Sequence, residues 1–131
     1  FRILPGETVE SVTSRVQEVI DDDRIEISAW ENGRNPSALS DPEGAAFQLL
    51  SQTIQQSVPG DVLVAPYLVM GGTDAKYYSG KSPNVFRFLA AKIEEGDMVR
   101  IHGTNERLRI DSFSSSIRFF AQLIHNVETL P

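Results

Sequence analysis

A histidine that follows a short apolar run is the side chain of this sequence best suited to metal chemistry. His102 comes after residues 98–101 and before a polar turn, and the chain contains only one other histidine. Imidazole is the commonest metal ligand in proteins, and a catalytic zinc ion takes His, Asp and Glu ligands while leaving one position for water. A lone histidine is more often a hydrogen-bonded structural residue, so the residues around it decide between the two interpretations.

A second stretch with candidate chemistry is Gly71-Gly72-Thr73-Asp74, which follows the most apolar run of the chain at residues 62–70. Two glycines let a backbone approach a ligand closely, and free N–H groups at the start of a helical turn suit an anion. Taken alone, such a turn is usually structural. Ligands of open α/β sheets gather outside the carboxyl ends of the strands, so we expect this stretch and the histidine to share one cleft.

Together the two stretches resemble the dinuclear zinc exopeptidases that include aminoacylase, Gly-Xaa carboxypeptidase and succinyl-diaminopimelate desuccinylase (metallopeptidase family 20). The resemblance rests on the Gly-Gly-Thr-Asp stretch and on His-Gly-Thr-Asn-Glu at residues 102–106, and it covers nearly the whole chain. It implies hydrolysis of an amide bond next to a free carboxylate, as in N-acyl amino acids or short peptides. Residues 84–88, Asn-Val-Phe-Arg-Phe, are most similar to the Gly-Xaa carboxypeptidase and N-acyl-amino-acid hydrolase branch.

The resemblance implies a role for each residue of the histidine motif. His102 would bind one of the two zinc ions of the family, and Asn105 and Glu106 would support it by fixing the ring and its tautomer. The family's other ligands, a His-x-Asp pair, a bridging Asp, a Glu-Glu pair that includes the general base and a further acid, would lie in an N-terminal half that this chain lacks. Glu94 and Glu95 are expected to be solvated and do not replace them. We therefore expect a fragment with no catalytic residues, an incomplete zinc site and no activity of its own.

The resemblance also implies a set of residues that bind the substrate. The family often places an arginine near the crossing between its two domains to hold a substrate carboxylate, and Arg34 lies in the corresponding polar loop. A guanidinium fork matches two carboxylate oxygens, although an arginine in such a loop is ordinarily just solvated. Lys76 departs from the arginine of many members and lacks that fork. The expected substrate-binding residues are Gly72, Thr73, Asp74 and Arg34.

The first third of the chain has the pattern of half an α/β sandwich. A short strand at residues 1–4 ends at a Pro-Gly turn, Thr8 caps a helix with an apolar stripe, and residues 24–30 alternate as a half-buried strand. The three acids at residues 21–23 end this helix and are expected to be solvated rather than metal-binding. In the family, Arg-x-Leu-Pro-Gly (residues 2–6 here) lies in the lid, or dimerisation, domain.

The rest of the chain has the pattern of an α/β domain. A helix capped by Asp41 ends at residues 59–60, and strands are expected at residues 62–70, 85–89 and 98–102. Pro66 conflicts with a central strand and predicts an edge position, a bulge or an early end. Asp111 is expected to cap the last helix. Its expected core-facing stripe is Phe113, Ile117, Phe120 and Ile124.

The fold class expected is therefore α/β: part of an α/β sandwich lid domain at residues 1–36, followed by the end of a zinc-exopeptidase catalytic domain at residues 37–131. The expected partners are the N-terminal half of the same protein and a small N-acyl amino acid or peptide substrate. A homodimer formed through the lid domain is a further possible assembly. A net charge of −6 argues against nucleic acid, and no apolar run is long enough to span a membrane. The alternative function is a non-catalytic dimerisation or interaction module of the same fold.

Overall fold

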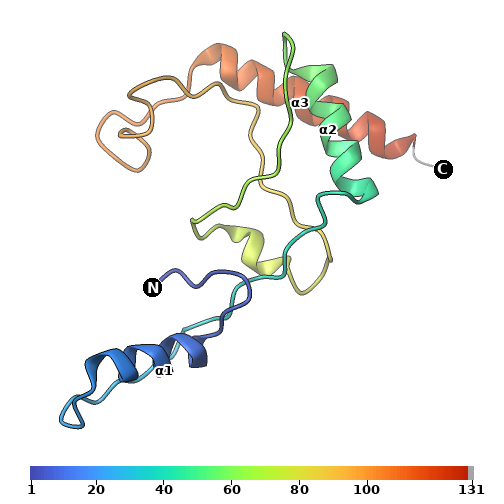
Figure 1. The fold of residues 1–131 in the computed structure, drawn as a ribbon. Coiled ribbons are helices and arrows are strands. Elements are labelled where there is room, and N and C mark those ends of the chain that lie inside the picture. Colours follow the sequence, from blue (N-terminus) through green and yellow to red (C-terminus); the bar gives the residue numbers. More distant parts are fainter. Residues whose placement is uncertain (130–131) are drawn as a thin grey trace. The chain divides into compact units, whose positions relative to one another are not determined.

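The regular structure of this chain is helical. The computed structural model describes residues 1–129 (Figure 1), in which the helices are α1 (Val9–Ile20), α2 (Ala45–Ser57), the 3-10 helix η1 (Asp74–Tyr77) and α3 (Ile110–Glu128). The chain divides into two compact units. The first unit comprises residues 1–40 and 70–85, and the second comprises residues 41–69 and those from 86 onward.

Helix α1 of the first unit begins and ends where the sequence predicts. The Thr8 hydroxyl accepts a hydrogen bond from the N–H of Ser11 (3.1 Å), and the Ser11 hydroxyl accepts one from the N–H of Thr8 (2.9 Å), which completes a capping box. Asp21 ends the helix in the left-handed region with φ +45°. The predicted apolar stripe is only half-buried, because no residue of α1 is buried and Val19 is exposed.

The core of the second unit lies between α2 and α3. Ile54 of α2 and Phe119 of α3 are buried together with Ala90 from the loop that precedes α3. The Phe119 ring lies 4.8 Å from the ring of Phe88, centroid to centroid. The same cluster is extended by half-buried side chains: Leu50, Val58, Val62, Val64 and Leu123.

Polar side chains at the far end of α3 also join the two helices. The amide nitrogen of Asn126 donates to the Thr53 hydroxyl and to the Gln56 side-chain carbonyl, both at 2.8 Å. Gln122 donates to the carbonyl oxygen of Asn126 at 2.8 Å. Asn126 and Thr53 are buried and fully partnered, so these bonds fix the register of α3 against α2.

Two predicted helix starts differ from the structure by a few residues. Helix α2 begins at Ala45 with Gly44 as its N-cap, and Asp41 instead accepts a hydrogen bond from the N–H of Glu43 (2.9 Å) in the turn before it. Helix α3 begins at Ile110, so Asp111 lies in the first turn and is not the cap. An aspartate close to a helix start can close a local turn or accept from a first-turn N–H as readily as it caps, which spacing alone does not resolve.

None of the predicted strands is formed within residues 1–129, so the α/β prediction is not confirmed. A strand needs a neighbour for its N–H and C=O groups and cover for its apolar face. At residues 62–70, Val62 and Val64 face the core cluster, but Leu63 is 92% exposed and every side chain from 65 to 70 is exposed. The inward alternation thus stops just before Pro66. A continuous apolar run such as residues 62–70 is typical of a strand covered on both faces, but here the segment is covered on one face and only at its start.

The stripe that was predicted to pack α3 into the core is also wrong. Phe113, Ile117, Phe120 and Ile124 are between 48% and 61% exposed. The face of α3 that packs in the second unit is the one next to this stripe. It contains Ser112, Ser116, Phe119, Leu123 and Asn126. The small side chains of Ser112 and Ser116 let the backbone at Ala90 come close to α3. The Ser116 hydroxyl donates to the carbonyl oxygen of Ala90 at 3.4 Å.

None of the helices within residues 1–129 combines the length and the apolarity that crossing a bilayer requires. The predicted domain limits, 1–36 and 37–131, remain a prediction.

Candidate metal-binding and substrate-binding residues

His102 lies in a series of turns rather than at the end of a strand. The N–H of Arg100 donates to the carbonyl oxygen of Asp97 (2.9 Å), and the N–H of Gly103 donates to that of Arg100 (2.8 Å). His102 and Asn105 both have left-handed backbones, with φ of +58° and +61°. This conformation is uncommon for residues other than glycine and marks a tightly shaped loop. The His102 side chain is exposed.

A glycine after the histidine is required by this loop. A Cβ atom at Gly103 would lie 2.9 Å from the carbonyl oxygen of Val99, which is too close for any side chain. The His-Gly pair of the motif therefore has a local structural reason in addition to any chemistry.

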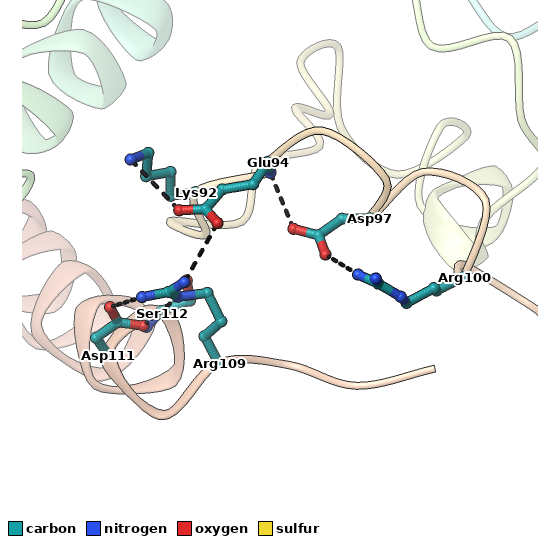
Figure 2. A network of polar contacts seen from close by, with 7 residues as sticks. All are labelled: Lys92, Glu94, Asp97, Arg100, Arg109, Asp111 and Ser112. Carbon is teal, nitrogen blue, oxygen red and sulfur yellow. Dashed lines mark hydrogen bonds and ion pairs between the residues drawn. The ribbon is translucent and has the colours of Figure 1, made fainter. Parts of the chain in front are cut away.

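Asp97 organises the turns that lead to the histidine (Figure 2). One carboxylate oxygen accepts from the N–H of Glu94 (2.9 Å), and the other accepts from the guanidinium of Arg100 (2.8 Å). The bond from the Glu94 N–H, with the charge of Arg100 as a smaller cause, lowers the pKa of Asp97 below its ordinary range. Asp97 is thus a charged anchor of the loop. Sequence reasoning missed it, although the i, i+3 pair of Asp and Arg was a readable signal.

A second ionic cluster joins this loop to the start of α3. Arg109 forms a two-bond pair with Asp111 (3.1 and 3.0 Å) and lies 3.3 Å from a Glu94 oxygen, while Lys92 lies 3.5 Å from the other oxygen (Figure 2). The hydrogen bonds from Arg109 lower the pKa of Asp111, which also accepts from the N–H of Ser112. Glu94 is therefore exposed and paired with two cations, Lys92 and Arg109. That Glu94 and Glu95 do not serve as metal ligands remains a prediction.

The residues present do not form a zinc site on their own. Within residues 1–129, no three His, Cys, Asp or Glu side chains gather closely enough to hold a metal ion. Asp22, of the acidic run after α1, is instead paired with Arg24 (2.6 Å), which lowers its pKa. Zinc sites normally have three or four protein ligands. His102 can therefore be at most one ligand of a site that other side chains complete.

The Gly-Gly-Thr-Asp stretch begins a short helix, as predicted. Thr73 is the N-cap of η1, and its hydroxyl accepts from the N–H of Ala75 (3.3 Å). Asp74 lies in the first turn. A Cβ atom at Gly72 would lie 3.4 Å from a guanidinium nitrogen of Arg2, so this arginine approaches the bare glycine backbone. The placement of Arg2 beside Gly72 was not predicted.

Two further cations belong to the first unit. The Lys76 ammonium lies 4.9 Å from the centre of the Tyr77 ring, a cation–π distance that gives this departure from the family pattern a local role. Arg34 is exposed in its loop. That loop is anchored to α1, because the side chain of Asn35 accepts a hydrogen bond from the N–H of Val9 (2.9 Å).

The predicted site residues divide between the two units. Arg34, Gly72, Thr73 and Asp74 belong to the first unit, whereas His102, Asn105 and Glu106 belong to the second. The single cleft shared by the two motifs remains a prediction.

Comparison with known proteins assigns the family. The profile described as "Peptidase family M20/M25/M40" matches residues 3–126, so the chain belongs to this family. It is 38% identical over 98% of its length to a Dictyostelium discoideum protein named "Probable carboxypeptidase S-like 2", of which it covers 24%. It is 32% identical over 98% of its length to a human N-fatty-acyl-amino acid synthase/hydrolase, of which it covers 26%. The chain thus spans about a quarter of the length of these curated relatives. No solved structure matches it.

Proposed function

We propose that this chain is part of a metal-dependent hydrolase that cleaves a peptide or amide bond next to a free carboxylate. The observation that carries the proposal is the family match over residues 3–126, which includes both the Gly-Gly-Thr-Asp and the His-Gly-Thr-Asn-Glu stretches. Relatives named as carboxypeptidase S-like and as N-fatty-acyl-amino acid synthase/hydrolase support this class of bond. Both names refer to an amide bond whose nitrogen belongs to an amino acid with a free carboxylate.

In this proposal His102 supplies one ligand to a dinuclear zinc centre. Exposure of its ring and the absence of any other acid or histidine cluster around it within residues 1–129 are compatible with a ligand that meets its metal only when other parts of the protein are present. Asn105 and Glu106 follow in the same shaped loop and would orient the ring. The general base and the other ligands would come from residues outside this chain.

The substrate carboxylate would be held by residues of the first unit. Arg34 offers a guanidinium fork, and the bare backbone at Gly72 lies beside the positive charge of Arg2. Thr73 and Asp74 would complete this side of the cleft. Support comes from the Arg2 guanidinium beside the bare backbone of Gly72, an arrangement suited to a small anion.

The same proposal includes the α/β architecture for the whole domain. Residues 62–70 and 85–89 would become strands once neighbouring strands supply hydrogen-bond partners and cover. Residues 1–36 would belong to the lid domain and residues 37–131 to the catalytic domain. The lid domain is also the part through which two copies of the protein could form a homodimer.

The test compares the two histidines of the chain in the longest natural protein that contains these residues. His102→Ala is expected to remove metal and nearly all hydrolysis of N-acyl amino acids and short peptides, because alanine cannot coordinate. His125→Ala is the matched control, since His125 is exposed in the last turn of α3. Metal content by atomic emission and turnover are measured on both variants, and thermal unfolding confirms that both fold.

Retention of metal and normal turnover in His102→Ala would show that this histidine is structural only. The coding sequence upstream separates the two classes of function. A His-x-Asp pair and a Glu-Glu pair there are expected for the enzyme, whereas their absence would identify a non-catalytic dimerisation or interaction module.

A further inference from the structure

A series of turns that share their corner residues leads to His102. The N–H of Asp97 donates to the carbonyl oxygen of Glu94 at 3.0 Å, and the N–H of Arg100 donates to that of Asp97 at 2.9 Å. The N–H of Gly103 closes the last turn on the carbonyl oxygen of Arg100 at 2.8 Å. Each residue that ends one turn begins the next, so a change in an early turn is passed along the backbone to the last one. His102 is the third residue of that last turn.

This third position is held in an unfavourable backbone conformation. His102 has φ +58°, in the left-handed region where glycine or asparagine is usual at the third position of a turn. Such a conformation costs free energy and persists only where the surrounding structure imposes it. Within residues 1–129, the imidazole itself forms no hydrogen bond or ion pair. The direction of the ring is therefore set by the backbone of the turn.

The side chain of Asp97 holds the turns before the histidine together (Figure 2). One carboxylate oxygen accepts from the N–H of Glu94 at 2.9 Å, and the other accepts from the guanidinium of Arg100 at 2.8 Å. The first bond lies across the opening turn and the second lies across the next one, so a single carboxylate ties both. Glu94 is also paired with Arg109, whose other partner belongs to α3, and this fixes the start of the series to a helix.

The pair of Asp97 and Arg100 differs from an ordinary surface ion pair. Exposed pairs contribute little, because solvent screens the charges and ordering two long side chains costs entropy. Here the two side chains are only 27% and 35% exposed, and the carboxylate also accepts from a backbone N–H. That N–H, which belongs to Glu94, lowers the pKa of Asp97, so the carboxylate is charged at neutral pH. Asp97 is therefore suited to hold a backbone geometry.

We propose that Asp97 is a positioning residue for His102: through its bonds to Glu94 and Arg100 it keeps the last turn in the left-handed form from which the imidazole binds its metal. It acts through the backbone and supplies no ligand. This inference rests on the proposed function, because it takes His102 as a metal ligand. A ligand must be held within about 0.5 Å and 10–20° of its productive geometry, so a loosened turn weakens metal binding although every ligand is still present.

The test measures zinc affinity in the longest natural protein that contains these residues. Asp97→Asn keeps the size of the side chain and removes its charge. Glu95→Gln is the matched control, because it removes one negative charge from an exposed position of the same loop. The metal-free proteins are titrated with zinc in competition with a chromogenic chelator, and His102→Ala and the double variant His102→Ala/Asp97→Asn are titrated beside them. Thermal unfolding establishes that each variant is folded.

Asp97→Asn is expected to weaken zinc binding by about 10-fold or more, as replacement of groups that orient a metal ligand does. Arg100→Gln removes the other half of the pair and is expected to have the same effect, so the role can be judged on either variant if the other fails to fold. Glu95→Gln is expected to stay within about twofold of the wild type. In the His102→Ala background, Asp97→Asn is expected to cause no further loss, because the ligand that it positions is already gone.

The outcomes separate this inference from the proposed function. Normal zinc affinity in His102→Ala would refute the proposed function and the positioning role with it. Loss of zinc in His102→Ala together with wild-type affinity in Asp97→Asn would refute the positioning role alone. An equal loss in Glu95→Gln would assign the effect to charge, and a further loss in the double variant would assign it to other parts of the protein. Either of these results would also overturn the positioning role.

A measurement without metal tests the geometric step by itself. Hydrogen exchange of the metal-free protein, resolved to single amides, reports the N–H groups of Arg100 and Gly103, which close the last two turns. Both are expected to exchange at least a few-fold faster in Asp97→Asn than in the wild type, and at the wild-type rate in Glu95→Gln. Unchanged exchange in Asp97→Asn would overturn the positioning role whatever the zinc affinities are.

Discussion

The packing of α3 can be tested by making the same truncation on its two faces. Phe119 is 1% exposed and contacts the rings of Phe88 and Phe120, at 4.8 and 5.2 Å, whereas Phe113 is 57% exposed. Phe119→Ala and Phe113→Ala remove identical atoms from one helix. They differ only in what surrounds those atoms, so each variant controls for the other.

The expected difference follows from the buried areas. A buried phenylalanine removes about 150–250 Å² from water, worth roughly 4–6 kcal/mol at about 25 cal/mol per Å². Measured Phe→Ala replacements in cores cost about 3–5 kcal/mol, since the unfolded chain already hides part of that area. For Phe113 less than half of the area is buried, so the cost of Phe113→Ala is at most about 2 kcal/mol. The better helix propensity of alanine lowers this cost by about 0.5 kcal/mol. We therefore expect Phe119→Ala to be the more destabilising by at least about 1.5 kcal/mol.

The assay is urea unfolding of the 131-residue chain, followed by far-UV circular dichroism. With a slope of about 1–3 kcal/mol per M, the two midpoints should differ by about 1 M. If Phe119→Ala shows no cooperative transition, Phe119→Leu, which keeps most of the volume, is expected to cost about 1 kcal/mol. Equal midpoints for the two alanine variants would refute the assignment of Phe119 to the packed face of α3 and of Phe113 to its exposed face.

Three further predictions follow from the polar contacts. Asn126→Ala is expected to destabilise the chain by about 1–3 kcal/mol in the same urea assay, because it removes the bond to Thr53 and leaves buried polar atoms without partners; no change would mean that the α2–α3 bonds are not formed in solution. Thr8→Ala, which removes the cap of α1, should cost about 1 kcal/mol and speed amide exchange in the first turn of α1 only, as measured by hydrogen-exchange mass spectrometry. Uniform exchange along α1 would contradict the capping box. The pairing with Arg109 lowers the pKa of Asp111 from 3.8, so its stabilising contribution is present above that value and is lost as the pH falls through the lowered folded pKa. An acid titration of unfolding should therefore lose this component below about pH 4 in the wild type and lack it in Asp111→Asn; identical acid profiles would exclude a contribution from the pair.

Turns and caps were the features that the sequence predicted well. The cap at Thr8, the end of α2 before Pro59 and the short helix after Thr73 are all present. Each depends on residues within a few positions of one another, because a side chain there satisfies a nearby backbone group whatever the rest of the chain does. The family assignment was likewise predicted from two short motifs and is confirmed by the match over residues 3–126.

The residues of the candidate site remain a prediction, and the local structure expected around His102 was wrong. His102 was expected at the end of a strand, and it lies instead in a left-handed turn that Asp97 and Gly103 shape. A run such as residues 98–101 is apolar enough for a strand or a turn, and the outcome depends on whether a neighbouring strand is present to pair with it. The meeting of this histidine with Gly72, Thr73 and Asp74 remains a prediction.

By itself the sequence determined where the helices begin and end to within a few residues, which residues carry the family motifs, and that α3 is apolar over much of its surface. Only the tertiary structure decided which side of α3 packs. Phe113 and Phe119 are equally apolar and belong to rows of equal period, so periodicity cannot rank them. The choice falls to partners far away in sequence, above all the hydrogen bond from Asn126 to Thr53, 73 residues earlier. Presenting the other apolar face of α3 to α2 would take the buried Asn126 amide away from both Thr53 and Gln56, its two partners on α2, and this loss favours the observed face.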